Sequence, residues 1–206
     1  MHHICSIPAP RSSSAELCST LASAAVISAA RRRAAREGDG YAWGNAPVSP
    51  LSGLTGNTLP GVSRPPWLRA QNKCNQFVGD VLHDAGFEMP TFRMPDRSLH
   101  YMHAEVLPRQ RRFFESISAL SAARAGDLLI LDDTRRRGES TAHVEIIETL
   151  SPTQLVTMGA HRAGVRSTDR SALLPRLRLP PSGNGWSSGS SRIYILRPIR
   201  ARPEGE

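Results

Sequence analysis

Apolar side chains recur with helical spacing in one short segment of the chain. Residues 74–86 place six of them at i, i+3, i+4, i+7, i+8 and i+11: Cys74, Phe77, Val78, Val81, Leu82 and Ala85. This spacing gathers them on one face of an amphipathic helix. Gly86 follows as a C-terminal stop, and Asn72 precedes the segment as an N-cap candidate. The pattern therefore predicts a helix that begins at Cys74.

Two further segments are predicted to be helical. Residues 15–37 are rich in Ala, Leu and Arg and contain neither Gly nor Pro, and Gly38 and Gly40 end the segment. Another helix is expected near 111–123. Residues 41–66 and 175–191 hold many Pro, Gly and Ser residues, so we expect long loops there.

The second half of the chain has the patterns of strands. Apolar or alternating runs occupy residues 127–131, 143–148, 155–158 and 192–196, with short polar linkers between the first three. Alternation places His143, Glu145 and Ile147 on one face of a strand, and Val144 and Ile146 on the other. The pattern predicts an antiparallel meander packed against the helix at Cys74. The fold class is therefore α+β, with N-terminal helices on a central antiparallel sheet.

The predicted organisation is a leader and Ala/Arg-rich helix in residues 1–40, a main domain in 41–200 and a tail in 201–206. The net charge of +8 invites a nucleic-acid interpretation, but 25 of the 26 basic residues are arginines spread along the whole chain. This bias is more typical of genome composition than of a phosphate site. The clusters Arg31–Arg33 and Arg135–Arg137 are expected to be mostly solvated faces.

Apolar runs and cysteines exclude several classes. No apolar run approaches the roughly 18 residues of a membrane span. The apolar stretch 21–30 lacks a positive n-region and is followed at once by three arginines, so it is predicted to belong to a helix rather than to an export signal. The three cysteines show no CxxC or metal-ligand spacing, so neither a metal nor another cofactor is predicted.

Cys74 is the candidate nucleophile. A thiol attacks as thiolate, and a helix N-terminus favours that charge. An imidazole within reach would take the proton, and His143 opens a strand about 70 residues downstream. Judged on its helix alone, Cys74 would pass as a buried structural thiol. A histidine at the head of a core strand is an odd choice unless it faces a pocket, and this favours the catalytic interpretation.

Three segments carry a resemblance to a known family: residues 72–86, which open Asn-Lys-Cys-Asn, then Ala125-Gly-Asp-Leu-Leu-Ile130, then Ala142-His-Val-Glu-Ile-Ile147. In order and spacing they resemble the papain-like cysteine hydrolases of the NlpC and CHAP type, which cleave amide bonds in peptidoglycan. The Asn-Lys-Cys-Asn opening is most similar to the amidase toxins that bacteria inject into competitors. The resemblance covers about 75 residues and implies a papain-like fold.

The resemblance also implies roles. Cys74 attacks the scissile carbonyl, His143 accepts the thiol proton and later protonates the leaving amine, and the backbone N–H of Cys74 helps to hold the oxyanion. Asp127 is expected to be structural. The family places a third polar residue on the following strand, where His161 is available. Glu145, on the face of His143, is the alternative, and the sequence leaves the choice between the two open.

The function expected from this resemblance is hydrolysis of peptidoglycan stem peptides by a cysteine amidase or endopeptidase that acts as an antibacterial effector. Two alternatives remain: a papain-fold deamidase or acyltransferase acting on a protein target, and an Arg-rich nucleic-acid-binding module, which is disfavoured. Without a signal peptide, the enzyme would be made in the cytoplasm, secreted, and active in the periplasm of a target bacterium. A cognate immunity protein is the expected partner, whereas nucleic acid and a membrane span are not expected.

Overall fold

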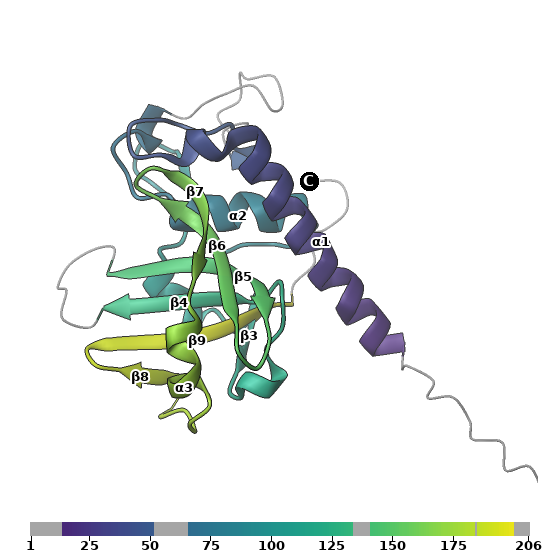
Figure 1. The fold of residues 1–206 in the computed structure, drawn as a ribbon. Coiled ribbons are helices and arrows are strands. Elements are labelled where there is room, and N and C mark those ends of the chain that lie inside the picture. Colours follow the sequence, from purple (N-terminus) through teal and green to yellow (C-terminus); the bar gives the residue numbers. More distant parts are fainter. Residues whose placement is uncertain (1–13, 52–65, 134–140, 184, 200–206) are drawn as a thin grey trace, which may run out of the picture.

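The computed structural model describes residues 14–51, 66–133, 141–183 and 185–199 of the chain. They form an α+β structure around one antiparallel sheet (Figure 1). The strands lie in the order β3-β9-β4-β5-β6-β7, and β8 pairs with β9. Their bounds are β3 Phe114–Ile117, β4 Leu128–Asp133, β5 Ala142–Leu150, β6 Leu155–His161, β7 Gly164–Asp169, β8 Trp186–Ser188 and β9 Ser191–Pro198.

Helices and short turns complete the fold. The α-helices are α1 Ser14–Glu37, α2 Cys74–Asp84 and α3 Leu174–Leu177, and β1 Thr91–Arg93 pairs with β2 Leu99–Tyr101 as a separate hairpin. Short 3₁₀ segments are η1 Gly38–Tyr41, η3 Pro66–Leu68, η4 Ala104–Arg109, η5 Leu120–Ala122 and η6 Ser171–Leu173. None of the helices within the described residues is long and apolar enough to cross a membrane.

The predicted meander is confirmed. Strands β4, β5, β6 and β7 follow one another as antiparallel neighbours, with Leu131 opposite His143 and Ile146 opposite Met158. The C-terminal strand β9 enters on the other side of β4 and separates it from β3. The catalytic candidates on β5 and β6 therefore lie on neighbouring central strands.

Apolar side chains are buried on both faces of this sheet. Val144, Ile146 and Met158 belong to the core shared with α1 and α2, whereas Ile147 and Leu155 belong to a second core with α3 and Trp186. This division follows the period of two in a strand, and it confirms that Val144 and Ile146 share a face that excludes Ile147.

The two long helices share one core. Val26, Ala29 and Ala30 of α1 are buried in the same cluster as Phe77 and Val78 of α2. Arg33 of α1 adds an ion pair across the helices, with its Nε 2.7 Å from Oδ2 of Asp84. The helix predicted for 15–37 is thus confirmed, and it contributes side chains to the core on which the helix of Cys74 packs.

Two sequence predictions are wrong. Residues 111–123 form strand β3 and the turn η5 instead of a helix, because the outer edge of β9 offers backbone partners, with Phe114 opposite Pro198 and Ile117 opposite Ile195. The loop predicted for 175–191 contains most of α3 and all of β8. It is fixed there by Trp186, which is fully buried and donates its Nε1–H to the carbonyl of Leu179 at 2.7 Å.

The ends of α2 agree with the sequence except at the cap. Gly86 has φ +82°, the left-handed conformation expected of a residue that stops a helix. The N-cap is Lys73, not Asn72, and the Lys73 side chain makes no capping hydrogen bond. Within the described part of the chain, the first N–H groups of α2 therefore lack the side-chain partner that a capping residue supplies. The leader before residue 14, the cluster Arg135–Arg137, residues 52–65 of the first loop and the tail 201–206 lie outside the described residues.

Close packing at Gly79 in α2 gives a test of the fold. A Cβ at this position would lie 2.4 Å from the ring of Tyr101, whereas a Cβ at Gly44 would meet nothing within 4 Å. Overpacking costs roughly 1–3 kcal/mol, which exceeds the gain of about 1 kcal/mol for Ala over Gly inside a helix. Gly79→Ala should therefore lower the free energy of unfolding, measured by urea denaturation. Gly44→Ala should leave it within about 0.5 kcal/mol; equal effects would contradict this packing.

Candidate active site

Cys74 is the first residue of α2 and is buried, with 5% of its surface exposed. It lines a cavity of about 170 Å³ together with His143 and His161. At the first turn of a helix the N–H groups have no intrahelical partner and the dipole is positive. The thiol therefore sits where a negative charge is stabilised.

His143 in β5 is held between Cys74 and Glu145. Its Nε2 donates a hydrogen bond to Oε1 of Glu145 at 3.0 Å, which leaves Nδ1 as the nitrogen available to the thiol. Burial lowers the pKa of His143, but hydrogen bonds and opposite charges from Cys74 and Glu145 outweigh it and raise the pKa to about 9. The ring is therefore an imidazolium at neutral pH.

Glu145 is fully buried, and four neighbouring side chains surround its carboxylate. Thr157 Oγ1 donates to Oε2 at 2.5 Å, and Arg170 forms a two-point ion pair, Nε to Oε2 at 2.9 Å and Nη2 to Oε1 at 2.7 Å. His143 and His161 both contact Oε1. Burial raises the pKa of Glu145, but the hydrogen bonds from His143, Arg170 and Thr157 hold it well below its ordinary value. The group is a fixed carboxylate.

A glycine opposite Glu145 makes room for that carboxylate. Gly159 lies in β6, and a Cβ there would stand 2.7 Å from Cγ of Glu145. Contacts this short essentially do not occur, so any side chain at position 159 would displace Glu145 from His143. Gly159 in β6 therefore leaves the space that the Glu145 side chain occupies.

His161 at the end of β6 lies beside this chain of contacts. Its ring centroid is 4.9 Å from that of His143, and its Nε2 is 3.1 Å from Oε1 of Glu145. Burial and the positive charge of His143 lower the pKa of His161, against the opposite effect of Glu145, so it is the neutral histidine of the pair. The structure brings both candidates for the third residue to the site, and Glu145 is the one hydrogen-bonded to the His143 ring.

The donor set of His143, Glu145 and His161 could in principle hold a metal ion, since their ligand atoms lie within 4.8 Å of one another. The arrangement favours a hydrogen-bonded network instead. The two histidine nitrogens stand at hydrogen-bonding distance from one carboxylate oxygen, and Arg170 already occupies both oxygens with its guanidinium. A metal ion bound to Glu145 would have to displace the guanidinium of Arg170.

Lys73, the only lysine of the chain, lines the same cavity as His143 and fixes the loop beside it. Its side chain is 2% exposed, and Nζ donates to the carbonyls of Ala42, Trp43 and Gln71 at 2.9, 3.2 and 3.1 Å. Burial lowers the pKa of Lys73 to about 8. These bonds bring Trp43 to the cavity that Cys74 lines.

A second buried carboxylate ties the same loop to α2. Asp80 accepts hydrogen bonds from Tyr41 Oη at 2.6 Å, Ser49 Oγ at 2.7 Å and Gln76 Nε2 at 2.9 Å. Burial raises the pKa of Asp80 to about 6, against the opposing effect of Arg33 and these hydrogen bonds. Residues 41–49 are therefore anchored to the second turn of α2.

Asp127 has the structural role that the sequence indicated. It accepts the backbone N–H of Arg124 at 2.9 Å and the Nε–H of Arg197 at 2.9 Å, and it follows Gly126, whose φ is +89°. The Gly-Asp turn is thus locked to β9, and it sets where β4 begins.

Sequence reasoning missed several residues of the site. Arg170, Thr157 and Gly159 act on Glu145 from β6 and the end of β7, and no motif marks them. Lys73 carried a signal, because one lysine among 26 basic residues stands directly before the candidate nucleophile. The contacts of Trp43 follow from the folded loop alone.

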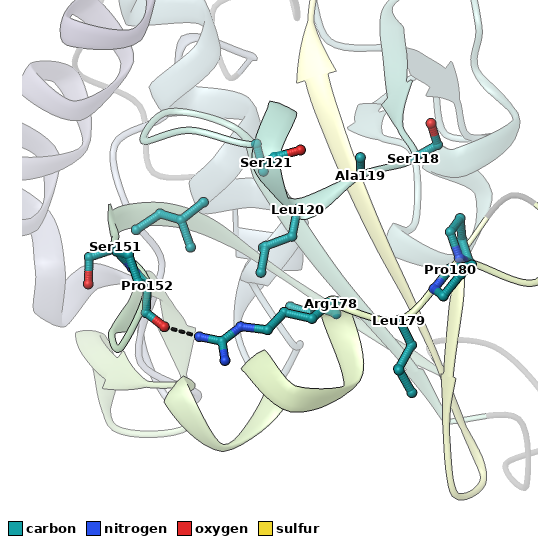
Figure 2. Close-up of a pocket in the computed structure, with 13 residues that line it drawn as sticks. Ser118, Ala119, Leu120, Ser121, Ser151, Pro152, Arg178, Leu179 and Pro180 are labelled. Atoms are coloured by element: carbon teal, nitrogen blue, oxygen red, sulfur yellow. Dashed lines mark hydrogen bonds between the residues drawn. The ribbon is translucent and has the colours of Figure 1, made fainter.

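Of two further cavities, one adjoins the site and the other lies apart from it. One of about 420 Å³ also reaches Cys74 and is lined by Trp67, Phe92, His100 and His103 among others. A third, of about 560 Å³, is shown in Figure 2. Its walls are mainly apolar, with Arg178 donating to the carbonyl of Pro152 across it. It includes none of the residues that surround Cys74, so we assign it no part in the chemistry.

Comparisons with known proteins add no relative. A scan against protein-family models gave no match, and neither did a search of curated proteins.

The charge of Glu145 should set the pKa of His143. Glu145→Gln preserves the shape of the side chain but removes the negative charge, so the pKa of His143 should fall from about 9 toward the ordinary 6.5. Histidine chemical shifts followed over pH by NMR measure this directly.

The matched control is Glu148→Gln on the same strand, where the carboxylate pairs with Arg31 at 3.1 Å and does not touch the histidines. It should leave the titration of His143 unchanged. An unaltered His143 titration in Glu145→Gln would show that the carboxylate does not determine the charge state of this ring.

Proposed function

We propose that this protein is a papain-like cysteine hydrolase that cleaves amide bonds in peptidoglycan stem peptides. The observation that carries the proposal is the unbroken contact chain from Cys74 through His143 to Glu145. It is the arrangement a thiol nucleophile needs: a base beside it and an acceptor that orients the base. The peptidoglycan substrate is supported by the order and spacing of the three sequence motifs.

The first half-reaction forms a thioester. The Cys74 thiolate attacks the scissile carbonyl carbon, and the free N–H groups at the start of α2 stabilise the oxyanion. The tetrahedral intermediate collapses as the C–N bond breaks, and the His143 imidazolium gives its proton to the departing nitrogen. In this step Glu145 holds the ring in place and stabilises its charge.

The second half-reaction restores the enzyme. Water attacks the thioester carbonyl while neutral His143 takes a proton from it. The C–S bond then breaks, the carboxylic acid product leaves, and the thiolate–imidazolium pair is formed again. Glu145 remains ionised throughout, because Arg170 and Thr157 keep their hydrogen bonds to it.

The motif at Cys74 also supports a biological role for the proposed hydrolase. The Asn-Lys-Cys-Asn opening supports an antibacterial effector that is made in the producer's cytoplasm and delivered to the periplasm of a rival. A cognate immunity protein would then protect the producer, and an acidic one would suit the net charge of +8. Cell lysis on periplasmic export, with none on cytoplasmic expression, is the expected behaviour.

Digestion of purified sacculi tests the chemistry. The wild-type protein should release new amine termini, and Cys74→Ala and His143→Ala should each lower the rate by a factor of about 10³ or more. Cys18→Ala serves as the matched control and should retain the activity. Mass analysis of the muropeptides identifies the bond.

Two outcomes would count against this proposal. Equal release by wild type and by a folded Cys74→Ala variant would remove Cys74 as the nucleophile. A mass increase of about one dalton in a protein target, without cleavage of peptidoglycan, would point to deamidation by the same residues instead.

The pH dependence follows from His143. Its imidazolium protonates the leaving amine, and its pKa is raised to about 9. Because that proton is present below the pKa and lost above it, kcat/KM should hold up to about pH 8 and fall tenfold per unit well above pH 9. Initial rates between pH 6 and 10.5 measure this; a decline centred near 6.5 would contradict the assigned pair.

A further inference from the structure

The two cavities that meet at Cys74 differ in chemistry. They share Trp43, Gln71, Asn72 and Cys74. The larger is aromatic and includes one acidic residue, Asp96. The smaller, of about 170 Å³, has no acidic side chain in its lining and adds His143, His161 and Arg162. A substrate bound across Cys74 would therefore meet an aromatic groove on one side and a basic pocket on the other.

Arg162 is held in place at the wall of the basic pocket. It lies in the turn between β6 and β7, and its guanidinium carbon stands 5.7 Å from the centroid of the Trp43 ring. The backbone carbonyl of Arg162 accepts the N–H of Trp43 at 3.0 Å. The Trp43 carbonyl in turn accepts the N–H of Ala70 at 2.8 Å and Nζ of Lys73. The arginine thus stacks on a platform fixed to the start of α2.

The positive charge of the Arg162 guanidinium is not paired with a carboxylate among the described residues. Arg33, Arg170 and Arg197 are each paired with a carboxylate. Arg162 is exposed and forms no ion pair within the described part of the chain. The other two cations in the pocket lining are already engaged: Lys73 donates to three backbone carbonyls, and the His143 imidazolium is hydrogen-bonded to Glu145. Arg162 is therefore the cation of this pocket that is placed to receive an anion.

The chemistry fixes which half of the substrate reaches Arg162. His143 protonates the departing nitrogen, so the amine half of the amide must lie on the His143 side of Cys74. That side is the basic pocket, because His143, His161 and Arg162 line the same cavity. The acyl half then extends into the aromatic groove.

We infer that Arg162 is a specificity residue that binds a carboxylate on the amine half of the substrate. The preferred substrates are amides whose leaving amine belongs to an amino acid or peptide that carries a free carboxylate close to that nitrogen. The inference rests on the proposed function and deepens it. It predicts that amidation of this carboxylate, with the scissile bond unchanged, weakens binding.

A matched pair of synthetic stem tetrapeptides tests this: one with free carboxylates and one amidated at the carboxylate on the amine side of the bond that the enzyme cleaves. For the wild type, kcat/KM should favour the acid form about tenfold, the effect of one exposed charge-assisted hydrogen bond. Arg162→Ala should remove the preference by raising KM for the acid form with kcat little changed. Arg162→Lys should retain part of it.

The control is Arg112→Ala. Arg112 also stacks on an aromatic ring, with its guanidinium carbon 6.0 Å from the centroid of Phe113, but it lines neither cavity at Cys74. It should keep the wild-type preference. Hydrolysis of both peptides with the same preference in wild type and Arg162→Ala would overturn the role of Arg162 alone. Hydrolysis of neither peptide nor sacculi by the wild type would overturn the proposed function and this inference with it.

Discussion

A fully buried, ionised carboxylate is the constraint around which the site is built. A charge taken out of water is costly unless it is paired and hydrogen-bonded. Glu145 meets that condition with a guanidinium from the end of β7, a hydroxyl from β6 and two imidazoles. The carboxylate of Glu145 in β5 therefore contacts β6 and the residue that follows β7. Because Arg170 and Thr157 hold this carboxylate in place, it also fixes the His143 ring that faces Cys74.

The opposite wall of the site is built by a similar rule. Lys73 and Asp80 are buried charged residues at the N-cap and in the second turn of α2, and each takes two of its hydrogen-bond partners from residues 41–49. Tyr41 and Ala46 of this loop are buried, and the Tyr41 ring meets Phe77 of α2 edge-on, with 5.2 Å between the ring centroids. This packing and the hydrogen bonds to Lys73 and Asp80 together place Trp43, and through it Arg162, beside Cys74.

The sequence predicted those parts of the fold that depend on local periodicity. Helix α2, its stop at Gly86 and the strands β4, β5, β6 and β9 all follow from patterns of apolar positions, and so does the division of β5 between two cores. The helix predicted for residues 111–123 is wrong because part of this segment pairs with β9, a strand far downstream in the sequence. The prediction that Asn72 caps α2 is wrong: the N-cap is Lys73. A local residue pattern does not show at which residue the backbone enters the helix.

The site divides in the same way. Cys74 and His143 each head an element with a clear period, so their pairing could be anticipated from motif order. The choice between Glu145 and His161 depended on which atom reaches Nε2 of His143, and Arg170 enters only through the pairing of β6 with β7. Such contacts depend on the register of the strands, because a slip of one residue moves each side chain to the other face of the sheet.

The position of helix α1 in the core determines what its removal by proteolysis would do. Its Val26, Ala29 and Ala30 cover the outer side of the core that carries α2, and its Ser23 lies against the Gly126 turn. Proteolysis that released this helix would uncover the apolar side chains that share its core, among them those of α2. The helix therefore belongs to the same core as α2 and is not a segment that can be removed without exposing that core.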